Sequence, residues 1–197
     1  MIILGITGSI ATGKSTVVEW MKDRSIPIHE ADAVVHDLFL NDQQLIKKVG
    51  VLFPKSLNKD KIDRRKLADI VFTEQEHLKK LEAIVHPRVY QIQKAFLQSH
   101  QAMNTPLVVL EVPLLYEKGY DKICDYVIVM TCNPETQKHR TLLRPGMTEE
   151  RLAAIRSAQI SDEEKINLAD YVLNSEDPKD QVFQKLHLIL KEIHSFH

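Results

Sequence analysis

The segment with the clearest chemical potential is "GSIATGKS", residues 8–15. It fits the pattern G-x-x-x-x-G-K-[ST] at every fixed position, which are Gly8, Gly13, Lys14 and Ser15. The glycines let the backbone curl into a nest of N–H groups for an anion, and the following helix adds its positive end. Lys14 can reach the β- and γ-phosphates, and the Ser15 hydroxyl can ligate Mg²⁺. The segment therefore predicts a site for a nucleoside triphosphate.

The rest of the loop is expected to contact the same phosphates through its backbone, and Thr16 is available for a further contact. The residues between the fixed positions are Ser9, Ile10, Ala11 and Thr12. The alternative is a glycine-containing turn that binds no ligand. A β-branched run before the loop and helical spacing after it favour the phosphate site, because the motif requires a strand on one side and a helix on the other.

A carboxylate that could serve phosphoryl transfer follows the second predicted strand. The run "IPIHEAD" at 26–32 ends on acidic residues, and Asp32 lies just past its carboxyl end. In an open α/β sheet this edge is where ligands bind. A kinase that acts on a hydroxyl needs a carboxylate there to accept the proton. The alternative is that Asp32 merely caps a helix starting at Ala33.

Three further charged residues are candidates for the same site. Glu111 ends a strong predicted strand, where its carboxylate could hold Mg²⁺ through water or could be a satisfied acidic residue. Arg140 and Arg144 are one helical turn apart, which predicts a shared face next to the "PGM" break. They could form a mobile clamp over ATP, as in kinases that close a lid. The alternative is a solvated basic face.

The elements that must position these residues alternate between strands and helices. Strands are predicted over 2–7, 26–32, 106–115, 125–132 and 170–174. A helix is predicted after the loop, with Val17, Val18 and Met21 facing inward. Two more are predicted over 134–144 and 148–159, and a short one follows a cap formed by Ser161 and Glu164. The last predicted helix has these residues facing inward: Val182, Leu186, Ile189 and Ile193. This order predicts an α/β fold, a parallel sheet covered by helices on both faces.

The stretch from about 41 to 102 differs from the rest. It contains no convincing strand, only amphipathic helical segments at 42–53, 63–72, 74–85 and 87–98. We therefore expect an inserted helical lobe within one catalytic domain, which 197 residues can accommodate.

Composition excludes several classes of protein. A net charge of −1 gives no overall attraction to nucleic acid or to an anionic membrane. Cys124 and Cys132 are too few for a disulfide framework and lack zinc-site spacing, so we expect buried thiols in a reducing compartment. The first residues show no basic segment followed by a long apolar run, and we expect a cytoplasmic protein.

The phosphate motif alone is shared by switch GTPases, motor ATPases and small-molecule kinases. GTPases read guanine with an N-K-x-D tetrad at the end of a later strand, whereas the only near match, "NKDK" at 58–61, lacks the aspartate and lies in the helical lobe. The chain is also too small for an extended ATPase core. These observations favour a small-molecule kinase.

The chain resembles the dephospho-coenzyme A kinase family along nearly its whole length. The matching blocks, in order, are "TGSIATGKST", "EADAVVHDL", "DRRKLADIVF", "LEAIVHPRV", "EVPLLYE", "QKHRTLLR" and "ADYVLN". The resemblance implies transfer of the γ-phosphate of Mg²⁺-ATP to the ribose 3′-hydroxyl of dephospho-coenzyme A. It also implies three parts within residues 1–197: a core of 1–32, 103–137 and 161–197, a helical acceptor lobe of about 33–102, and a lid of about 138–160.

The resemblance also implies roles for individual residues. Asp32 falls on the family's proposed base, and Arg140 on an arginine that flanks the lid near the adenine or the phosphates. The acceptor would be held by the helical lobe, whose motifs contain Arg65, Phe72, His86 and Pro87. His86 receives no chemical role, because a histidine before proline at a helix junction can simply cap or pack.

The chain departs from the family's pattern at several positions. The family usually has glycine where this chain has Ser9 and Ala11, and aspartate where it has Glu30. Ser9 and Ala11 are small and occupy variable positions of the phosphate pattern, so the nest should survive if their φ angles are negative. "RPGM" replaces a more usual Arg-Asp-Gly, and its proline should stiffen the lid hinge.

Two other functions stay open at this point. The nearest is a kinase of the same architecture that acts on a nucleoside monophosphate or another small alcohol. The more distant one is a non-catalytic nucleotide-binding partner protein. For the kinase, the expected partners are the small molecules ATP and dephospho-coenzyme A, with no nucleic acid and no membrane, and the chain is expected to be a monomer or a small homo-oligomer.

Overall fold

The computed structural model describes residues 1–71 and 74–195 and divides into two compact units. The first unit comprises Met1–Ile28 and Thr105–His197, and the second comprises His29–Asn104. None of the helices in the described part of the chain is both long and apolar enough to cross a membrane.

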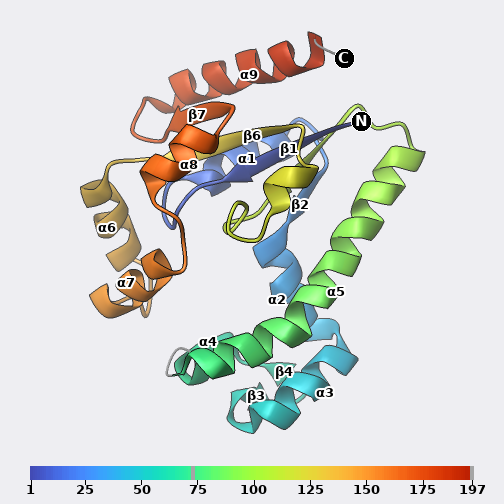
Figure 1. Ribbon diagram of the computed structural model, residues 1–197, viewed down its shortest axis with the longest axis vertical. Coiled ribbons are helices and arrows are strands. Elements are labelled where there is room, and N and C mark those ends of the chain that lie inside the picture. Colours follow the sequence, from blue (N-terminus) through green and yellow to red (C-terminus); the bar gives the residue numbers. More distant parts are fainter. Residues whose placement is uncertain (72–73, 196–197) are drawn as a thin grey trace. The chain divides into compact units, whose positions relative to one another are not determined.

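A five-stranded sheet organises the first unit (Figure 1). Its order is β2-β5-β1-β6-β7, with the strands β1 (Ile2–Thr7), β2 (Ile28–Glu30), β5 (Leu107–Glu111), β6 (Tyr126–Thr131) and β7 (Tyr171–Asn174). Strand β1 pairs in parallel with β5 and β6, and β6 pairs in parallel with β7. The carboxyl ends of these strands therefore lie along one edge of the sheet, where Glu111 is opposite Ile6 and Thr7 is opposite Val129.

Helices α1 (Lys14–Lys22) and α9 (Lys179–Ser195) cover one face of this sheet. Every second residue of the strands points into this layer, as Ile2, Leu4 and Ile6 do in β1. The helices contribute the apolar positions predicted from their spacing, Val17, Met21, Val182, Leu186, Ile189 and Ile193. In Figure 1, α9 runs beside β7.

The opposite face is covered by the segment after β5, which includes the 3-10 turn η2 (Tyr120–Ile123), and by α8 (Asp162–Leu168). Gly5 shows how closely they pack, because a Cβ there would lie 2.8 Å from Leu115 Cδ1. Both faces are thus buried, which explains why the strands are almost continuously apolar. The predicted α/β class is confirmed.

Helices α6 (Pro134–Leu142) and α7 (Glu149–Ser157) form a small pair in the first unit. Asn133 caps α6 by accepting from Glu135 N at 2.8 Å, and Thr148 caps α7 by accepting from Arg151 N at 3.3 Å. Between the helices, Gly146 adopts a φ of 77°.

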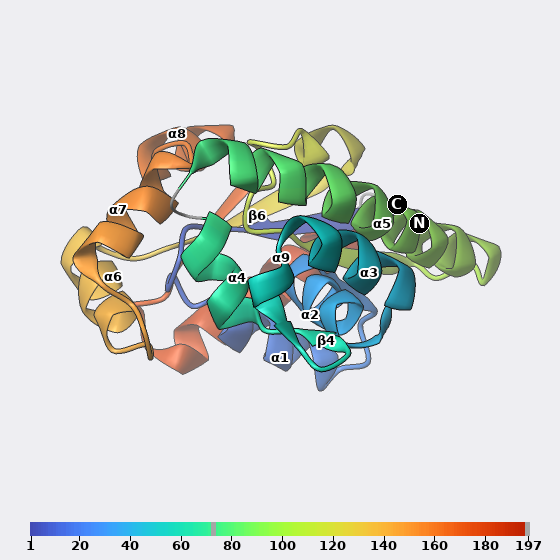
Figure 2. The same cartoon turned by 90° about the horizontal axis from the view of Figure 1, so that it is seen from below.

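The second unit is mainly helical (Figure 2). It contains α2 (Ala31–Asn41), α3 (Gln43–Leu52), the 3-10 turn η1 (Pro54–Ser56), α4 (Arg64–Val71) and α5 (Gln75–Ala102). Their apolar faces form a core that includes Phe39, Ile46, Val49, Leu67 and Val85. The expectation that this stretch contains no strand is wrong, since β3 (Leu57–Asn58) and β4 (Lys61–Ile62) form a hairpin. Strands of two residues are too short to show periodicity.

Helix α5 also corrects a prediction. The sequence suggested a break at Pro87, but one helix continues through it. Val85 and Val89, on either side, are both buried in the core of this unit, so tertiary packing offsets the hydrogen bond that proline removes. Arg88 adds a bond from its Nε to the Asp42 carboxylate at 2.6 Å, which joins α5 to the start of α3.

Candidate functional site

The phosphate loop follows β1 directly, and its two fixed glycines have structural reasons to be glycine. Gly8 has a φ of 145° and Gly13 a φ of 88°, conformations that other residues rarely adopt. A Cβ at Gly8 would lie 2.3 Å from Met130 O, and one at Gly13 would lie 2.8 Å from Ser175 Cβ. The loop is therefore pressed against the ends of β6 and β7.

Ala11 does not meet the condition of a negative φ that was set for the two residues at positions where the family usually has glycine. Its φ is 61°, whereas Ser9 is not among the residues with positive φ. The left-handed conformation costs an L-residue about 1–2 kcal/mol. The curl of the loop requires this conformation at residue 11 even though the chain has no glycine there, and Ala11 is held in place by burial.

Lys14 is folded back over the loop. Its Nζ donates to Gly8 O at 2.6 Å and to Ser9 O at 3.1 Å, while Thr12 Oγ1 donates to Ser9 O at 2.9 Å. Ser15 and Thr16 lie in the first turn of α1, and Ser15 is exposed. Among the described residues, no side chain caps this helix and no acidic residue lies in its first turn. Its positive end is thus available to an anion.

Arg140 approaches the loop through one intermediate residue. Its Nη1 donates to Ser175 Oγ at 2.7 Å and its Nη2 to Ser175 O at 3.4 Å, and Ser175 is the residue that packs against Gly13. Sequence reasoning missed Ser175, although its position directly after a predicted strand, at the edge where ligands bind, was a usable signal.

Arg144 does not share a helical face with Arg140. Helix α6 ends at Leu142, and Arg144 lies exposed in the turn that follows. That prediction is wrong because the helix stops two residues before Arg144. In the turn, Met147 N donates to Arg144 O at 3.1 Å.

Glu111 lies where the sequence placed it, at the carboxyl end of β5, and is only 8% exposed. Val112 N donates to Ile6 O at 3.0 Å, so the chain leaves the sheet at the same edge as the phosphate loop. No group of three or more His, Cys, Asp or Glu side chains within residues 1–71 and 74–195 could hold a metal ion. A hydroxyl and one carboxylate at this edge fit Mg²⁺, which is usually bound through one or two protein ligands, water and substrate phosphates.

Asp32 belongs to the second unit and is exposed in the first turn of α2. The N-cap position is occupied by Glu30, so the alternative that Asp32 caps this helix is wrong. Its role as a base stays a prediction.

The residues expected to hold the acceptor are spread over the second unit. Arg65 is exposed in α4, and its N–H donates to Asp63 Oδ1 at 3.0 Å. His86 and Pro87 lie inside α5 rather than at a helix junction, with His86 Nε2 3.8 Å from Glu82 Oε1. Phe72 lies outside the described residues.

A group of polar residues behind the loop was not found from the sequence. Lys165 in α8 is fully buried, and its Nζ donates to Ser9 Oγ at 3.2 Å and lies 3.3 Å from Glu117 Oε1. Next to it is a cavity of about 300 Å³ whose lining includes Ser9, Arg156 and Asp162. A lysine in a short helix is normally solvated, so the sequence held no signal for this arrangement.

The chain is similar to known proteins over nearly its whole length. A family model described as dephospho-CoA kinase matches residues 2–180. A dephospho-CoA kinase of Mesorhizobium japonicum is 42% identical over 89% of this chain and 88% of its own length. One from Rhizobium meliloti is 37% identical over 98% of both chains.

Solved structures show the same relationship. The dephospho-CoA kinase of Campylobacter jejuni is 28% identical, with a TM-score of 0.72, over 98% of this chain and 97% of that one. The protein TT1252 of Thermus thermophilus is 34% identical, with a TM-score of 0.79, over 97% of both chains. With the phosphate loop and the parallel sheet already described, these matches lead to one conclusion: the chain belongs to the dephospho-CoA kinase family.

Proposed function

We propose that the chain transfers the γ-phosphoryl group of ATP to the ribose 3′-hydroxyl of dephospho-coenzyme A, the final step of coenzyme A biosynthesis. The observation that supports this most directly is the phosphate loop of a family member, with Gly8 and Gly13 in the conformations that the loop requires and Lys14 folded over it. The chain is thus an ATP-dependent kinase with an alcohol as its acceptor.

The donor is held by the loop in this proposal. The N–H groups of residues 8–16 surround the β- and γ-phosphates, and Lys14 exchanges its bonds to Gly8 O and Ser9 O for phosphate oxygens. The Ser15 hydroxyl would ligate Mg²⁺, with Glu111 acting through water. The ion would neutralise charge on the phosphates. Arg140, near the loop through Ser175, stabilises charge that develops on the transferring group.

Asp32 orients the acceptor and takes its proton. The 3′-O–H bond breaks as the bond from this oxygen to the γ-phosphorus forms, and the bond to the leaving oxygen of ADP breaks. The proton passes to the Asp32 carboxylate. Because Asp32 is exposed in the first turn of α2, its side chain is accessible to a substrate.

Residues 33–102 serve as the acceptor lobe and residues 138–160 as the lid in this proposal. The lid would include part of α6, all of α7 and the turn with Arg144, so this arginine meets ATP only when the lid closes. Pro145 limits the movement of that turn. The protein would act in the cytoplasm as a monomer or small homo-oligomer, and its two free cysteines are compatible with a reducing compartment.

The test of the base is Asp32→Asn. We expect kcat to fall by roughly 10²- to 10⁴-fold, the usual contribution of an acid–base group, with the Kd of ATP nearly unchanged. Asp37→Asn is the matched control, because Asp37 is an exposed aspartate of the same helix that bonds only locally to Asn41 at 2.6 Å. Wild-type turnover in the Asp32 variant would rule out its role as base.

The acceptor is tested by coupled ADP release with dephospho-coenzyme A, nucleoside monophosphates and pantetheine derivatives. We expect release to depend on dephospho-coenzyme A. Preference for a nucleoside monophosphate would indicate the rival kinase. ATP binding without any acceptor-dependent release would indicate a non-catalytic protein.

A further inference from the structure

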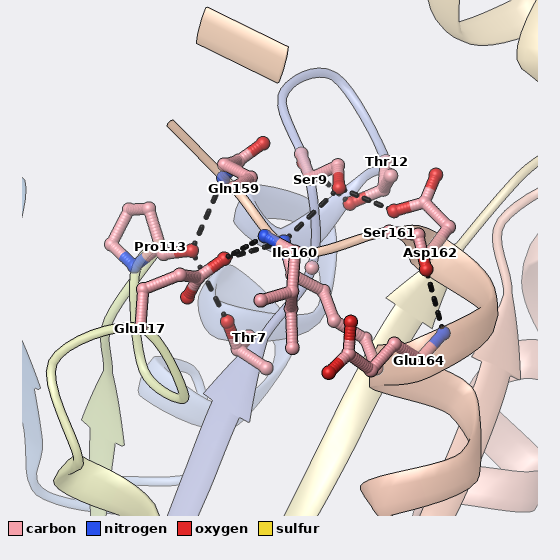
Figure 3. A network of polar contacts seen from close by, with 12 residues as sticks. Thr7, Ser9, Thr12, Pro113, Glu117, Gln159, Ile160, Ser161, Asp162 and Glu164 are labelled. Atoms are coloured by element: carbon pink, nitrogen blue, oxygen red, sulfur yellow. Dashed lines mark hydrogen bonds and ion pairs between the residues drawn. The ribbon is translucent and has the colours of Figure 1, made fainter. Parts of the chain in front are cut away.

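The first turn of α8 and the residues before it are attached to the back of the phosphate loop. Figure 3 shows Glu117, from the segment after β5, facing Ile160, while Asp162 and Ser9 face each other. Ile160 N donates to Glu117 Oε1 at 3.0 Å, and Gln159 Nε2 donates to Pro113 O at 3.3 Å. The connector 158–161 between α7 and α8 is therefore held at the sheet edge.

The centre of this attachment is the ion pair of Lys165 and Glu117. The Lys165 side chain is 0% exposed and the Glu117 side chain 10% exposed, with Nζ and Oε1 3.3 Å apart. Burying a charged group is strongly unfavourable unless it is paired and hydrogen-bonded. An apolar pair would fill the same space without that penalty, so a buried pair at this position calls for a reason beyond packing.

The Lys165 ammonium contacts the phosphate loop as well as Glu117, and this second contact supplies the reason. Lys165 Nζ donates to the hydroxyl of Ser9, and this hydroxyl in turn donates to Asp162 Oδ1. The carbonyl oxygen of Ser9 accepts from Lys14 Nζ and from Thr12 Oγ1. Residues of α8 thus hold the side chain of Ser9, and residues of the phosphate loop hold its backbone carbonyl group.

We propose that Lys165 and Glu117 are positioning residues that hold Ser9, and through it the phosphate loop and Lys14, in the geometry that ATP binding requires. Neither residue contacts the reacting atoms. The inference rests on the proposed role of the loop as the ATP site, and it predicts an effect on ATP and not on the acceptor.

The test compares Lys165→Met, Glu117→Gln and the double variant. Each single change leaves an unpaired buried polar group or charge, so we expect both to lower Tm, whereas the double variant, which contains no unpaired buried charge, should recover part of it. The Kd of ATP, measured by titration calorimetry without acceptor, should rise by about 10- to 100-fold in Lys165→Met, as expected for a lost hydrogen bond to a charged group. It should stay raised in the double variant.

A merely structural ion pair behaves differently. In that case ATP affinity would recover together with Tm in the double variant, and this result would overturn the proposal. A rise in KM for dephospho-coenzyme A as large as that for ATP would overturn it as well. Lys185→Met is the matched control, since Lys185 forms an exposed pair with Asp177 at 2.7 Å in the same unit, and its ATP affinity should equal that of the wild type.

Ser9→Gly keeps the test informative if the charge variants fail to fold. It removes the hydroxyl, with its bonds to Lys165 and Asp162, without unpairing Lys165 from Glu117. We therefore expect Tm to fall less than in the charge variants and the Kd of ATP to rise by roughly 10- to 100-fold, the worth of a hydrogen bond to a charged group. Unchanged affinity would contradict the link through Ser9. Because these readouts need only ATP, they are separate from the acceptor assay: absence of ADP release in the wild type would refute the proposed function and leave the loop measurements interpretable.

Discussion

Replacing Ala11 by glycine probes the backbone of the phosphate loop without touching a charged group. Ala11 has a φ of 61° and is 8% exposed, so its methyl group is buried while its backbone is strained. Most substitutions of alanine by glycine destabilise a protein. Here the relief of strain opposes that trend.

The expected change in the free energy of unfolding of Ala11→Gly is the sum of three contributions. Glycine removes a left-handed strain of about 1–2 kcal/mol. It adds about 0.4–1 kcal/mol of unfolded-chain entropy. It also removes a buried methyl group worth about 0.8 kcal/mol. The free energy of unfolding should therefore stay within about 1 kcal/mol of the wild-type value.

The assay is urea unfolding of Ala11→Gly beside two other variants. Ala153 is exposed in α7, where φ is negative, so Ala153→Gly should lose about 1 kcal/mol. Ala11→Val should be the least stable, because a β-branched residue is a severe outlier at positive φ. If Ala11→Gly loses more stability than Ala153→Gly, or if valine is tolerated, the account of strain at this position is wrong.

Three further predictions concern other parts of the fold. Gly8→Ala should abolish ATP binding in a calorimetric titration and lower stability by roughly 3 kcal/mol or more, because its Cβ would meet Met130 O at 2.3 Å; normal binding would contradict the packing described. The N–H of Leu45, and then Arg88, lower the pKa of Asp42, so this carboxylate stabilises the fold above its unfolded pKa of about 3.9, and the contribution disappears as pH falls through the lower folded value. Asp42→Asn should thus lose about 1 kcal/mol at pH 7, and this difference from the wild type should shrink as the pH falls below about 3.9. A difference that does not change with pH would refute this assignment. Burial raises the pKa of Cys124 to about 12, so this thiol should resist iodoacetamide at pH 8 in the folded protein and react after unfolding. Mass spectrometry of the labelled protein measures both states, and rapid labelling of the folded chain would contradict this prediction.

Local patterns were sufficient to predict the strand, loop and helix over residues 2–22. The motif specifies where glycine is needed, and the spacing of Val17 and Met21 identifies the buried side of α1. What the pattern could not give was the conformation of Ala11, since a positive φ at an alanine depends on the whole loop closing against β6 and β7.

Other features depended on tertiary structure. Pro87 is a local signal for a break, but packing on both sides of it keeps α5 continuous. The local sequence predicts a solvated side chain for Lys165, but in the folded chain this side chain is buried against Glu117 and Ser9, which are both distant in sequence. Sequence reasoning could place the residues that carry a motif, and it could not find residues whose role depends on neighbours more than 40 positions away.

The attachment of the phosphate loop also bears on how the protein is made. The loop leaves the ribosome before the residues that hold Ser9, which follow 153 and 156 positions later, and before Ser175, which follows later still. Contacts of such sequence separation form slowly, because a long stretch of chain must be closed before they contribute. A nascent chain that has reached the end of β6 thus has the complete motif without the residues that fix it. With the proposed role of Lys165 in holding the loop, nucleotide binding becomes a property of the protein only after α8 has been synthesised.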